Sequence, residues 1–275
     1  MKYLNACKLV FLFSFFLIFS ACKDDNTSPG EQVDVHIIMG QSNSLGVGHA
    51  YQLPKEMREP QDSCYIFNKA SGKYEIIQAG VNTQSQEGMF GPVVKAAQLL
   101  RDHQKKEVYF IVVGFGNSQL FKSNESEIQD WHPESNELLP FAKSEIERAR
   151  KALEASGKTP VFKTLSWWQG EADGTYSEKA NVYLENETAF FAALDQVSYL
   201  ANTKRIIFKV FEDVAAMPHG HVVNTAKIKR ASTDSRTVSI IETNSYDRIP
   251  QDKLHATAKG QLQAGTDLFN AIKKL

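Results

Sequence analysis

The sequence has little excess charge of either sign and no long run of basic residues. Its 275 residues contain 31 Lys and Arg against 32 Asp and Glu, which gives a formal net charge of −1. Proteins that bind nucleic acids usually carry a basic patch or stripe that faces the phosphates. The charge balance therefore argues against that function class, and we expect no nucleic-acid partner.

The sequence also lacks, at its start, a hydrophobic run long enough to cross a bilayer. The apolar run from Leu9 to Phe19 covers about 11 residues, against the ~20 that a spanning helix needs. It follows Lys2 and Lys8 and precedes the small residues Ser20-Ala21. Such a charged start and short apolar core are typical of a secretory signal peptide. We predict a signal peptide over residues 1–21.

Cleavage after residue 21 would leave Cys22 as the first residue. The segment resembles a bacterial lipobox, with Phe19 where Leu is more usual, and this resemblance implies that Cys22 is lipidated after export. An ordinary signal peptide followed by an incidental cysteine is the alternative. Lys23-Asp24-Asp25 resembles the acidic export signal of surface lipoproteins. We therefore expect an exported, outer-membrane-anchored lipoprotein, periplasmic or at the cell surface, that meets the membrane through its N-terminal lipid.

Cysteine is scarce, with three in the chain. Cys7 lies in the predicted signal peptide and Cys22 would carry lipid, so Cys64 has no partner and no disulfide is predicted within the mature domain. The apolar surroundings of Cys64 favour a buried strand residue over a nucleophile.

The chain also lacks repeats and low-complexity tracts. Residues 23–32 are polar and include Pro29 and Gly30, so we predict a flexible tether over residues 22–32 that starts at the lipidated cysteine. Residues 33–275 show no second linker, and about 240 residues are enough for one domain with a sizeable core.

Short apolar segments alternate with helical patterns along this domain. Five strands are expected, over residues 33–39, 108–113, 161–167, 206–211 and 238–243. Apolar residues at helical spacing occur over residues 142–153 and 190–201, and a closing helix is expected over about 259–273. This alternation predicts an α/β three-layer α/β/α sandwich with a five-stranded, mainly parallel sheet. A side hairpin is expected over residues 64–77.

Ser42 is the candidate nucleophile. It follows the first predicted strand and Gly40, so a sharp turn would expose its hydroxyl at the carboxyl edge of the sheet, close to free backbone N–H groups. Taken alone, Gly-x-Ser is also a common turn sequence, and Ser44 is a nearby competitor.

Asp252-x-x-His255 is the candidate acid and base pair. This spacing lets the Asp252 carboxylate meet the Nδ1–H of His255 while Nε2 points toward a serine, as in a Ser-His-Asp triad. Taken alone, the same residues would suit a surface loop in which Asp252 caps a turn.

Oxyanion donors are available in two further loops. Gln169 follows a predicted strand, which would deliver its side-chain amide to the same edge of the sheet. Backbone N–H groups of Ser42 and of Gly116, in the turn Gly114 to Ser118, are the other candidates, although Gly116 would equally suit a simple turn.

Together these motifs resemble the SGNH hydrolases and, more narrowly, their sialate O-acetylesterase-like branch, grouped with carbohydrate esterase family six. The strings that carry the resemblance are Met39-Gly40-Gln41-Ser42-Asn43, Gly114 to Ser118, Trp167 to Asp173 and Asp252-x-x-His255. The resemblance implies an SGNH/flavodoxin-like fold, Ser42 as nucleophile, His255 as base and Asp252 as its orienting acid. It also implies an oxyanion hole built from Ser42, Gly116 and Gln169.

The sequence departs from the family pattern at one point and leaves one carboxylate to explain. The family often has two adjacent glycines where Phe115 here separates Gly114 from Gly116. A buried carboxylate at Glu171 would need polar partners. We expect Glu171, with Gln41 and Asn43, to support the site by bracing the Ser42 and Gln169 loops rather than to transfer a proton.

The resemblance implies a carbohydrate O-acetylesterase that releases acetate from O-acetylated sugars, either sialic acid or plant or host glycans, through an acyl-enzyme. No metal or cofactor is required. His219-Gly220-His221 lacks the cysteine or acidic partner of a metal site and is expected in a loop. Trp131, Trp168 and Tyr176 are candidates for stacking on a sugar, whereas Trp167 better fits the core.

Two alternatives stay open. An esterase of small non-sugar esters would share the triad and differ only in its pocket. A non-catalytic, glycan-binding surface lipoprotein would use a degenerate version of the same scaffold, but a complete set of Ser42, His255 and Gln169 argues against it.

Overall fold

The structure is a computed structural model that describes residues 30–123 and 129–275. The predicted signal peptide, Cys22 and most of the predicted tether lie outside these residues. The first strand, β1 (Glu31–Gly40), begins inside the stretch predicted as tether, because Glu31 and Gln32 pair with the start of β7 (Lys158–Trp168). Lys158 also forms an ion pair with Glu31 at 3.2 Å, so the strand pairing extends through polar residues.

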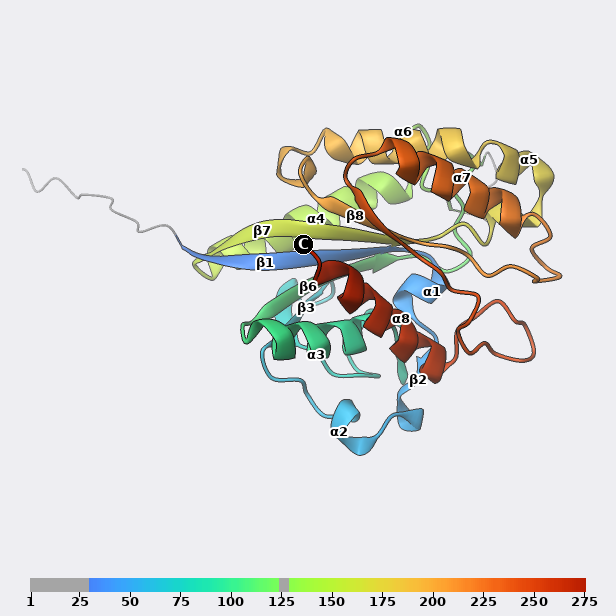
Figure 1. Cartoon of the computed structure of the whole chain (residues 1–275). Coiled ribbons are helices and arrows are strands. Elements are labelled where there is room, and N and C mark those ends of the chain that lie inside the picture. The colour runs from blue at the N-terminus through green and yellow to red at the C-terminus, as the bar shows by residue number, and fades with distance from the viewer. Residues whose placement is uncertain (1–29, 124–128) are drawn as a thin grey trace, which may run out of the picture.

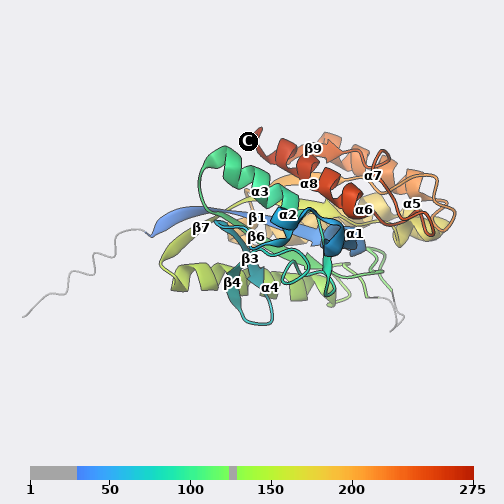
Figure 2. The same cartoon turned by 90° about the horizontal axis from the view of Figure 1, so that it is seen from below.

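The core of the fold is a seven-stranded sheet in the order β4-β3-β6-β1-β7-β8-β9. Its neighbours are parallel except for the antiparallel pair β3–β4. The remaining strands of this sheet are β3 (Cys64–Asn68), β4 (Lys73–Ile76), β6 (Val108–Gly114), β8 (Lys204–Phe208) and β9 (Thr237–Ile241). In Figure 2 the sheet runs from the β3–β4 hairpin at the bottom to β9 at the top.

The predicted fold class is confirmed, and all five expected strands are present. The sheet has seven strands instead of five because the predicted hairpin joins its edge through pairing of β3 with β6. Cys64 and Ile66 are fully buried in β3, so this strand belongs to the core. Burial raises the pKa of the Cys64 thiol to about 11, which suits a packing residue and not a nucleophile. A separate two-stranded sheet pairs β2 (Gly48–His49) with β5 (Met89–Phe90).

Helices cover both faces of the sheet, as Figure 1 shows. On one face α3 packs against α8, and on the other lie α4, α6 and α7. The helices are α1 (Ser42–Leu45), α2 (Lys55–Arg58), α3 (Val93–Gln104), α4 (Leu138–Ala155), α5 (Ser177–Asn181), α6 (Tyr183–Asp195), α7 (Gly220–Thr233) and α8 (Ala258–Ile272). Among the described residues, no helix is both long and apolar enough to span a membrane.

Two helix predictions need correction. The helical spacing over residues 190–201 predicted a helix to Ala201, but α6 ends at Asp195 and a 3-10 turn, Ser198–Leu200, follows. The loop predicted at His219-Gly220-His221 is the start of α7, with His219 as its N-cap residue. Because α7 buries polar side chains such as Lys227, its sequence lacks the apolar stripe by which a helix is usually found.

Candidate active site

Parallel strands bring their carboxyl ends to one edge of the sheet, where the loops after β1, β6 and β7 meet. The backbone of Gly40, at the end of β1, has a φ of +144°, and a Cβ atom there would lie 2.0 Å from the carbonyl oxygen of Trp168. Only glycine fits this approach. It lets the chain turn directly into α1, which begins with Ser42.

Ser42 and Ser44 differ in what their hydroxyls can do. Ser42 is half-buried, and its Oγ lies 2.9 Å from Nε2 of His255. Ser44 is buried, and its hydroxyl donates to the carbonyl oxygen of Gln41 at 2.6 Å. Ser42 is therefore the serine with an imidazole partner, and Ser44 holds the turn.

His255 connects Ser42 to Asp252. The Nδ1 atom of His255 lies 2.8 Å from Oδ2 of Asp252, and the other oxygen of Asp252 accepts from the backbone N–H groups of Leu254 and His255, at 2.8 and 3.1 Å. Partial burial alone would raise the pKa of Asp252, but the hydrogen bonds from the His255 ring and these backbone groups outweigh it and lower the pKa below its ordinary value. The carboxylate is thus kept ionised beside the imidazole.

Asn43 clamps the loop that carries His255. Its Nδ2 donates to the carbonyl oxygen of Leu254 at 3.0 Å, and its Oδ1 accepts from the N–H of Ala256 at 3.1 Å. The same Nδ2 also donates to Oε1 of Glu171 at 2.8 Å. One fully buried amide therefore grips the residues on either side of His255, and it follows Ser42 directly in the chain.

Glu171 lies behind this clamp, 2% exposed. Burial raises the pKa of its carboxyl, an effect that the hydrogen bond from Asn43 opposes. Its second oxygen, Oε2, has no hydrogen-bond partner among the described residues. Glu171 contacts Asn43 and not Ser42 or His255 in this hydrogen-bond chain, so its position suits a brace for the loops.

The amide of Gln169 differs from the sequence-based expectation of an oxyanion donor. The side chain is fully buried, and its Nε2 donates to Asp173 at 2.6 Å, to the carbonyl oxygen of Ser118 at 3.2 Å and to Oε1 of Gln41 at 3.3 Å. Its Oε1 accepts from the hydroxyl of Tyr183 at 3.0 Å. With three acceptors around two amide hydrogens, Gln169 ties loops together and presents no free N–H.

The backbone N–H groups of Ser42 and Gly116, the other two expected oxyanion donors, are unpaired within the described part of the chain. The N–H of Ser42 is in the first turn of α1, where a helix offers no acceptor, and the N–H of Gly116 lies in an exposed turn. Neither donates to another of the described residues. A Cβ atom at Gly116 would meet nothing within 4 Å, so packing does not require glycine there. Asn117, the next residue, takes the left-handed backbone conformation of this turn.

Asp173 is a site residue for which the sequence predicted no role. It is fully buried, and it accepts from the N–H groups of Leu120 and Phe121, at 2.9 and 2.8 Å, as well as from Gln169. It therefore ties the loop after β6 to the loop after β7. Its position at the end of the Trp-x-Gln-Gly-Glu-x-Asp string was the available signal.

The candidate sugar-stacking aromatics separate into two groups. Trp131, Trp167 and Trp168 are at most 1% exposed, and they pack in the core instead of facing a ligand. Tyr176 is 58% exposed. The expectation that Trp167 belongs to the core is confirmed, whereas the stacking role expected of Trp131 and Trp168 is wrong because both are buried. The sequence could not separate these two from Tyr176, since all of them lie beside site loops.

Comparisons with solved structures show proteins of similar fold. A protein from Arabidopsis thaliana is 17% identical over 90% of this chain and 99% of its own, with a TM-score of 0.68. NanS is 15% identical over 90% and 98%, with a TM-score of 0.63. A carbohydrate acetylesterase from Xanthomonas citri is 16% identical over 86% of this chain and 55% of its own, with a TM-score of 0.55. At these identities the likeness shows a shared fold.

No curated protein matches the chain in sequence. Residues 32–274, however, match the family described as "carbohydrate esterase, sialic acid-specific acetylesterase". This match covers nearly the whole of the described chain, and it confirms the resemblance found in the motifs. The chain therefore belongs to this family of carbohydrate esterases, and it is a carboxylic-ester hydrolase.

Proposed function

We propose that this protein is a serine acetylesterase that releases acetate from O-acetylated sugars. The observation that carries the proposal is the hydrogen-bond chain from Ser42 through His255 to Asp252, with distances of 2.9 and 2.8 Å. A serine hydroxyl paired with an imidazole, itself oriented by a carboxylate, is the arrangement that activates a serine for acyl transfer.

In the first half of the reaction, Nε2 of His255 takes the proton of Ser42 while Oγ attacks the acetyl carbonyl carbon. The N–H groups of Ser42 and Gly116 receive the oxyanion of the tetrahedral intermediate. The intermediate collapses as the bond to the sugar oxygen breaks, and His255 returns the proton to the leaving alcohol. Asp252 stabilises the imidazolium throughout.

In the second half, water takes the place of the sugar. His255 accepts a proton from the water as its oxygen attacks the acetyl-Ser42 carbonyl, and the same N–H groups receive the oxyanion. Collapse breaks the bond to Ser42 Oγ, which regains its proton from His255, and acetate leaves. Gln169 and Glu171 act in this scheme as braces that hold the loops.

The substrate class rests on the family and on the similar structures. The family description names sialic acid, and the similar protein from Xanthomonas citri is described as a carbohydrate acetylesterase. Acetylated sialic acid and acetylated plant or host glycans are the candidate substrates. A small non-sugar ester is the alternative, and it would fit the same triad.

We also propose a cellular location for this esterase. The sequence around Cys22 supports a lipoprotein anchored in the outer membrane, so that the esterase domain would act at the periplasmic or outer surface. Metabolic labelling of the full chain with a radioactive fatty acid, with Cys22→Ser as control, tests this. Label that persists in Cys22→Ser would contradict it.

The function is tested by acetate release from O-acetylated sialic acid and from acetylated xylan, with p-nitrophenyl acetate as a general ester. Ser42→Ala is expected to lower turnover of every substrate by at least ~10⁴-fold, because the nucleophile is lost. Ser44→Ala is the matched control, since it removes a neighbouring hydroxyl that only holds the turn, and it should keep turnover within a few fold. Ester hydrolysis that survives in pure, folded Ser42→Ala would refute the mechanism.

A further inference from the structure

A pocket lies beside the proposed catalytic site. Its volume is about 460 Å³, within the range of small-ligand sites. Its lining includes Asn117, Gln119, Ala172, Tyr176, Lys179 and Pro218. Asn117 is the chain neighbour of Gly116, and Ala172 is the chain neighbour of Glu171. The loops after β6 and β7 both contribute, and β1, whose end leads into α1 and Ser42, lies between these strands. The pocket is therefore placed to receive the part of a substrate that extends from the scissile ester.

Lys179 is the charged side chain in this lining, and the described residues that line the pocket include no acidic side chain. It is half-buried, and its Nζ donates to Oε1 of Gln119 at 2.7 Å. The ammonium also lies 5.1 Å from the ring centroid of Tyr176. Lys179 is thus held in one place at the pocket wall, whereas most surface lysines are free to move.

The ammonium of Lys179 forms no ion pair with any carboxylate in the described part of the chain. Its charge acts on the buried carboxyl of Asp173, whose oxygens already accept from Leu120, Phe121 and Gln169. Lys179 therefore retains N–H donors and a positive charge for a ligand.

A neighbouring hollow has the opposite charge. It shares Ala215 and Pro218 with the pocket, but Glu212 and Asp213 contribute to its wall. An anionic group would be repelled there and attracted to the side of Lys179. Because the two hollows share part of their walls, the charge difference favours the side of Lys179 for an acidic sugar.

We propose that Lys179 is a specificity-determining residue that binds a carboxylate on the leaving sugar, with the exposed ring of Tyr176 against the sugar itself. This inference rests on the proposed esterase function and deepens it, because it selects acetylated acidic sugars over neutral ones. A charge-assisted hydrogen bond to a fixed ammonium favours a carboxylate over an uncharged group of the same shape.

The test compares three esters with the full chain. They are an O-acetylated sialic acid, the same sugar with its carboxylate converted to a carboxamide, and p-nitrophenyl acetate, each followed by acetate release. Wild type should show a KM at least ~10-fold lower for the acid than for the amide, since a charge-assisted hydrogen bond is worth about that factor. Lys179→Gln should raise the KM of the acid to that of the amide and leave kcat and the other two esters unchanged.

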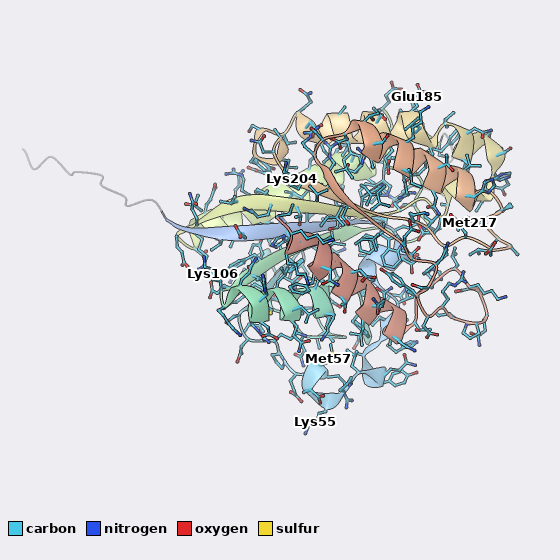
Figure 3. All side chains as sticks on the ribbon, in the orientation of Figure 1. Lys55, Met57, Lys106, Glu185, Lys204 and Met217 are labelled. Atoms are coloured by element: carbon cyan, nitrogen blue, oxygen red, sulfur yellow. The ribbon has the colours of Figure 1, made fainter. Side chains whose placement is uncertain are left out.

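Two further variants serve as controls. Lys179→Arg keeps the charge and should retain most of the preference. Lys204→Gln removes an exposed lysine at the start of β8 that does not line the pocket, and Figure 3 shows it well apart from Met217, which precedes Pro218 of the pocket wall. It should change nothing. Equal KM values for acid and amide in wild type, or an equal loss on all three esters in Lys179→Gln, would overturn the inference.

Calorimetric binding of the deacetylated sugar acid separates this inference from the proposed function. If none of the three esters is hydrolysed, the esterase proposal fails, yet acid binding that weakens ~10-fold in Lys179→Gln would still support the carboxylate site. If turnover is normal and the acid binds no better than its amide, the inference about Lys179 fails while the esterase proposal stands.

Discussion

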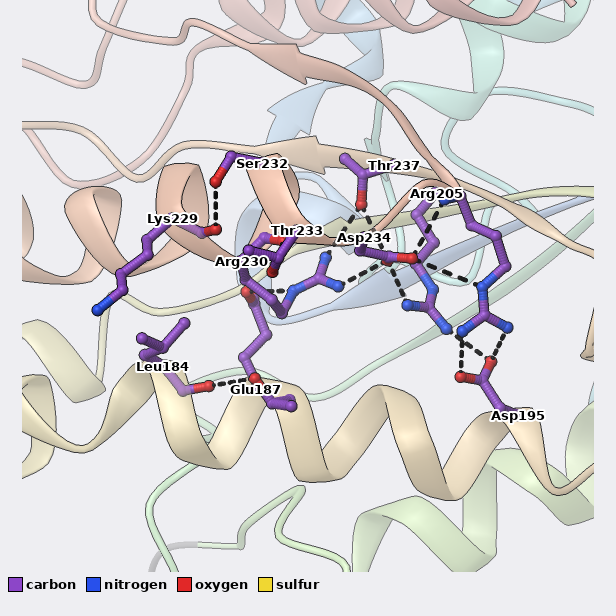
Figure 4. Close-up of polar contacts among 12 residues, drawn as sticks. Leu184, Glu187, Asp195, Arg205, Lys229, Arg230, Ser232, Thr233, Asp234 and Thr237 are labelled. Atoms are coloured by element: carbon purple, nitrogen blue, oxygen red, sulfur yellow. Dashed lines mark hydrogen bonds and ion pairs between the residues drawn. The ribbon is translucent and has the colours of Figure 1, made fainter.

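Two polar networks in this protein are built differently. The first lies at the carboxyl edge of the sheet and joins Ser42, His255 and Asp252 to the buried brace formed by Asn43 and Glu171. The second joins α6, α7, β8 and the start of β9, and Figure 4 shows it. Its members are Glu187, Asp195, Arg205, Arg230, Asp234, Arg236 and Thr237.

The second network, which we call the ion-pair network, matches each carboxylate with guanidinium groups. Arg230 lies 2.8 Å from Glu187 and 2.9 Å from Asp234, and Arg205 binds both Asp195 and Asp234. The arginines 205 and 230 are at most 6% exposed, so these charges are buried as well as paired. Paired buried charges fix the packing of helices and strands, because breaking one pair leaves its partner uncompensated.

The site network leaves groups uncompensated. Within the described residues, Oε2 of Glu171 has no hydrogen bond, and the N–H groups of Ser42 and Gly116 are free. His255 and Asp252 are partly exposed, with side chains 24% and 41% accessible. Among the described residues each network leaves one buried carboxylate oxygen without a hydrogen bond, Oε2 of Glu171 in the site and Oε1 of Glu187 in the ion-pair network. The difference therefore lies in counter-charge and exposure. Carboxylates buried against guanidinium groups hold the fold, whereas partly exposed side chains and free N–H groups are the ones available to a substrate.

Replacing Asp252 by asparagine should give the largest loss of activity and leave the stability of the fold nearly unchanged. We expect kcat to fall ~10⁴-fold, because an amide no longer holds His255 in the required tautomer. Stability should change by less than about 0.5 kcal/mol, since the side chain is 41% exposed. Steady-state kinetics and urea unfolding measure both, and a large loss of stability would mean that the site also holds the fold.

Replacing Arg230 by methionine should instead lower stability and leave activity unchanged. Loss of this buried guanidinium leaves Glu187 and Asp234 without a main partner, so we expect destabilisation of about 3–5 kcal/mol and unchanged kcat per folded molecule. Arg148→Met is the matched control, because its ion pair with Glu145 leaves the arginine 45% exposed and should contribute less than about 1 kcal/mol. Equal costs for the two variants would contradict the comparison.

Asn43→Ala sharpens the comparison inside the site. Removing the clamp around His255 should lower kcat by ~10²-fold through misplacement of the imidazole. Asn224→Ala is the control, since this buried amide similarly grips the N–H and carbonyl of Val210, each at 2.9 Å, but holds no catalytic loop. Both variants should lose some stability. If both lost kcat to the same extent, a specific clamp on His255 would be ruled out.

A fall in pH should change the stability contributed by two carboxylates, one from each network, in opposite directions. Burial of Asp234 would raise its pKa, but its hydrogen bond from Arg236 and the charges of Arg205 and Arg230 outweigh this and lower it well below the usual range. Its contribution to stability is therefore present above its ordinary pKa of about 3.9 and is lost as the pH falls through the folded value. Asp234→Asn should be roughly 2 kcal/mol less stable than wild type at pH 7, with a smaller difference at pH 3.

Glu171 has a raised pKa because of burial, so its contribution is present at low pH and is lost as the pH rises through the folded value. Wild type should therefore lose stability relative to Glu171→Gln as the pH rises from about 4 to 8. Urea unfolding across this range measures both variants, and slopes of the same sign would mean that the two carboxylates do not differ as described.

Much of the fold followed from local pattern. The continuous apolar segments of β1, β6 and β7 predicted the central strands. The sequence also predicted the hairpin over residues 64–77, but not that it joins the edge of the sheet. The α7 helix escaped prediction because it buries Lys227, Arg230 and Asn224 in place of an apolar stripe. Its stability comes from contacts with α6 and β9 and from the hydrogen bond of Lys227 to Phe208 in β8, none of which lies in one window of sequence.

For the site, the sequence by itself determined which polar residues follow the strands and in what order: Ser42 after Gly40, Gln169 after β7, and Asp252 three residues before His255. Parallel strands then necessarily collect such residues at one edge. Only the tertiary structure decided which polar groups already have hydrogen-bond partners within the protein and which remain unpaired. The hydrogen bonds from Asn43 to Glu171 and from Gln169 to Gln41 each join residues 128 positions apart in the chain, so they depend on tertiary packing and not on local sequence. They identify these amides as groups that brace the loops.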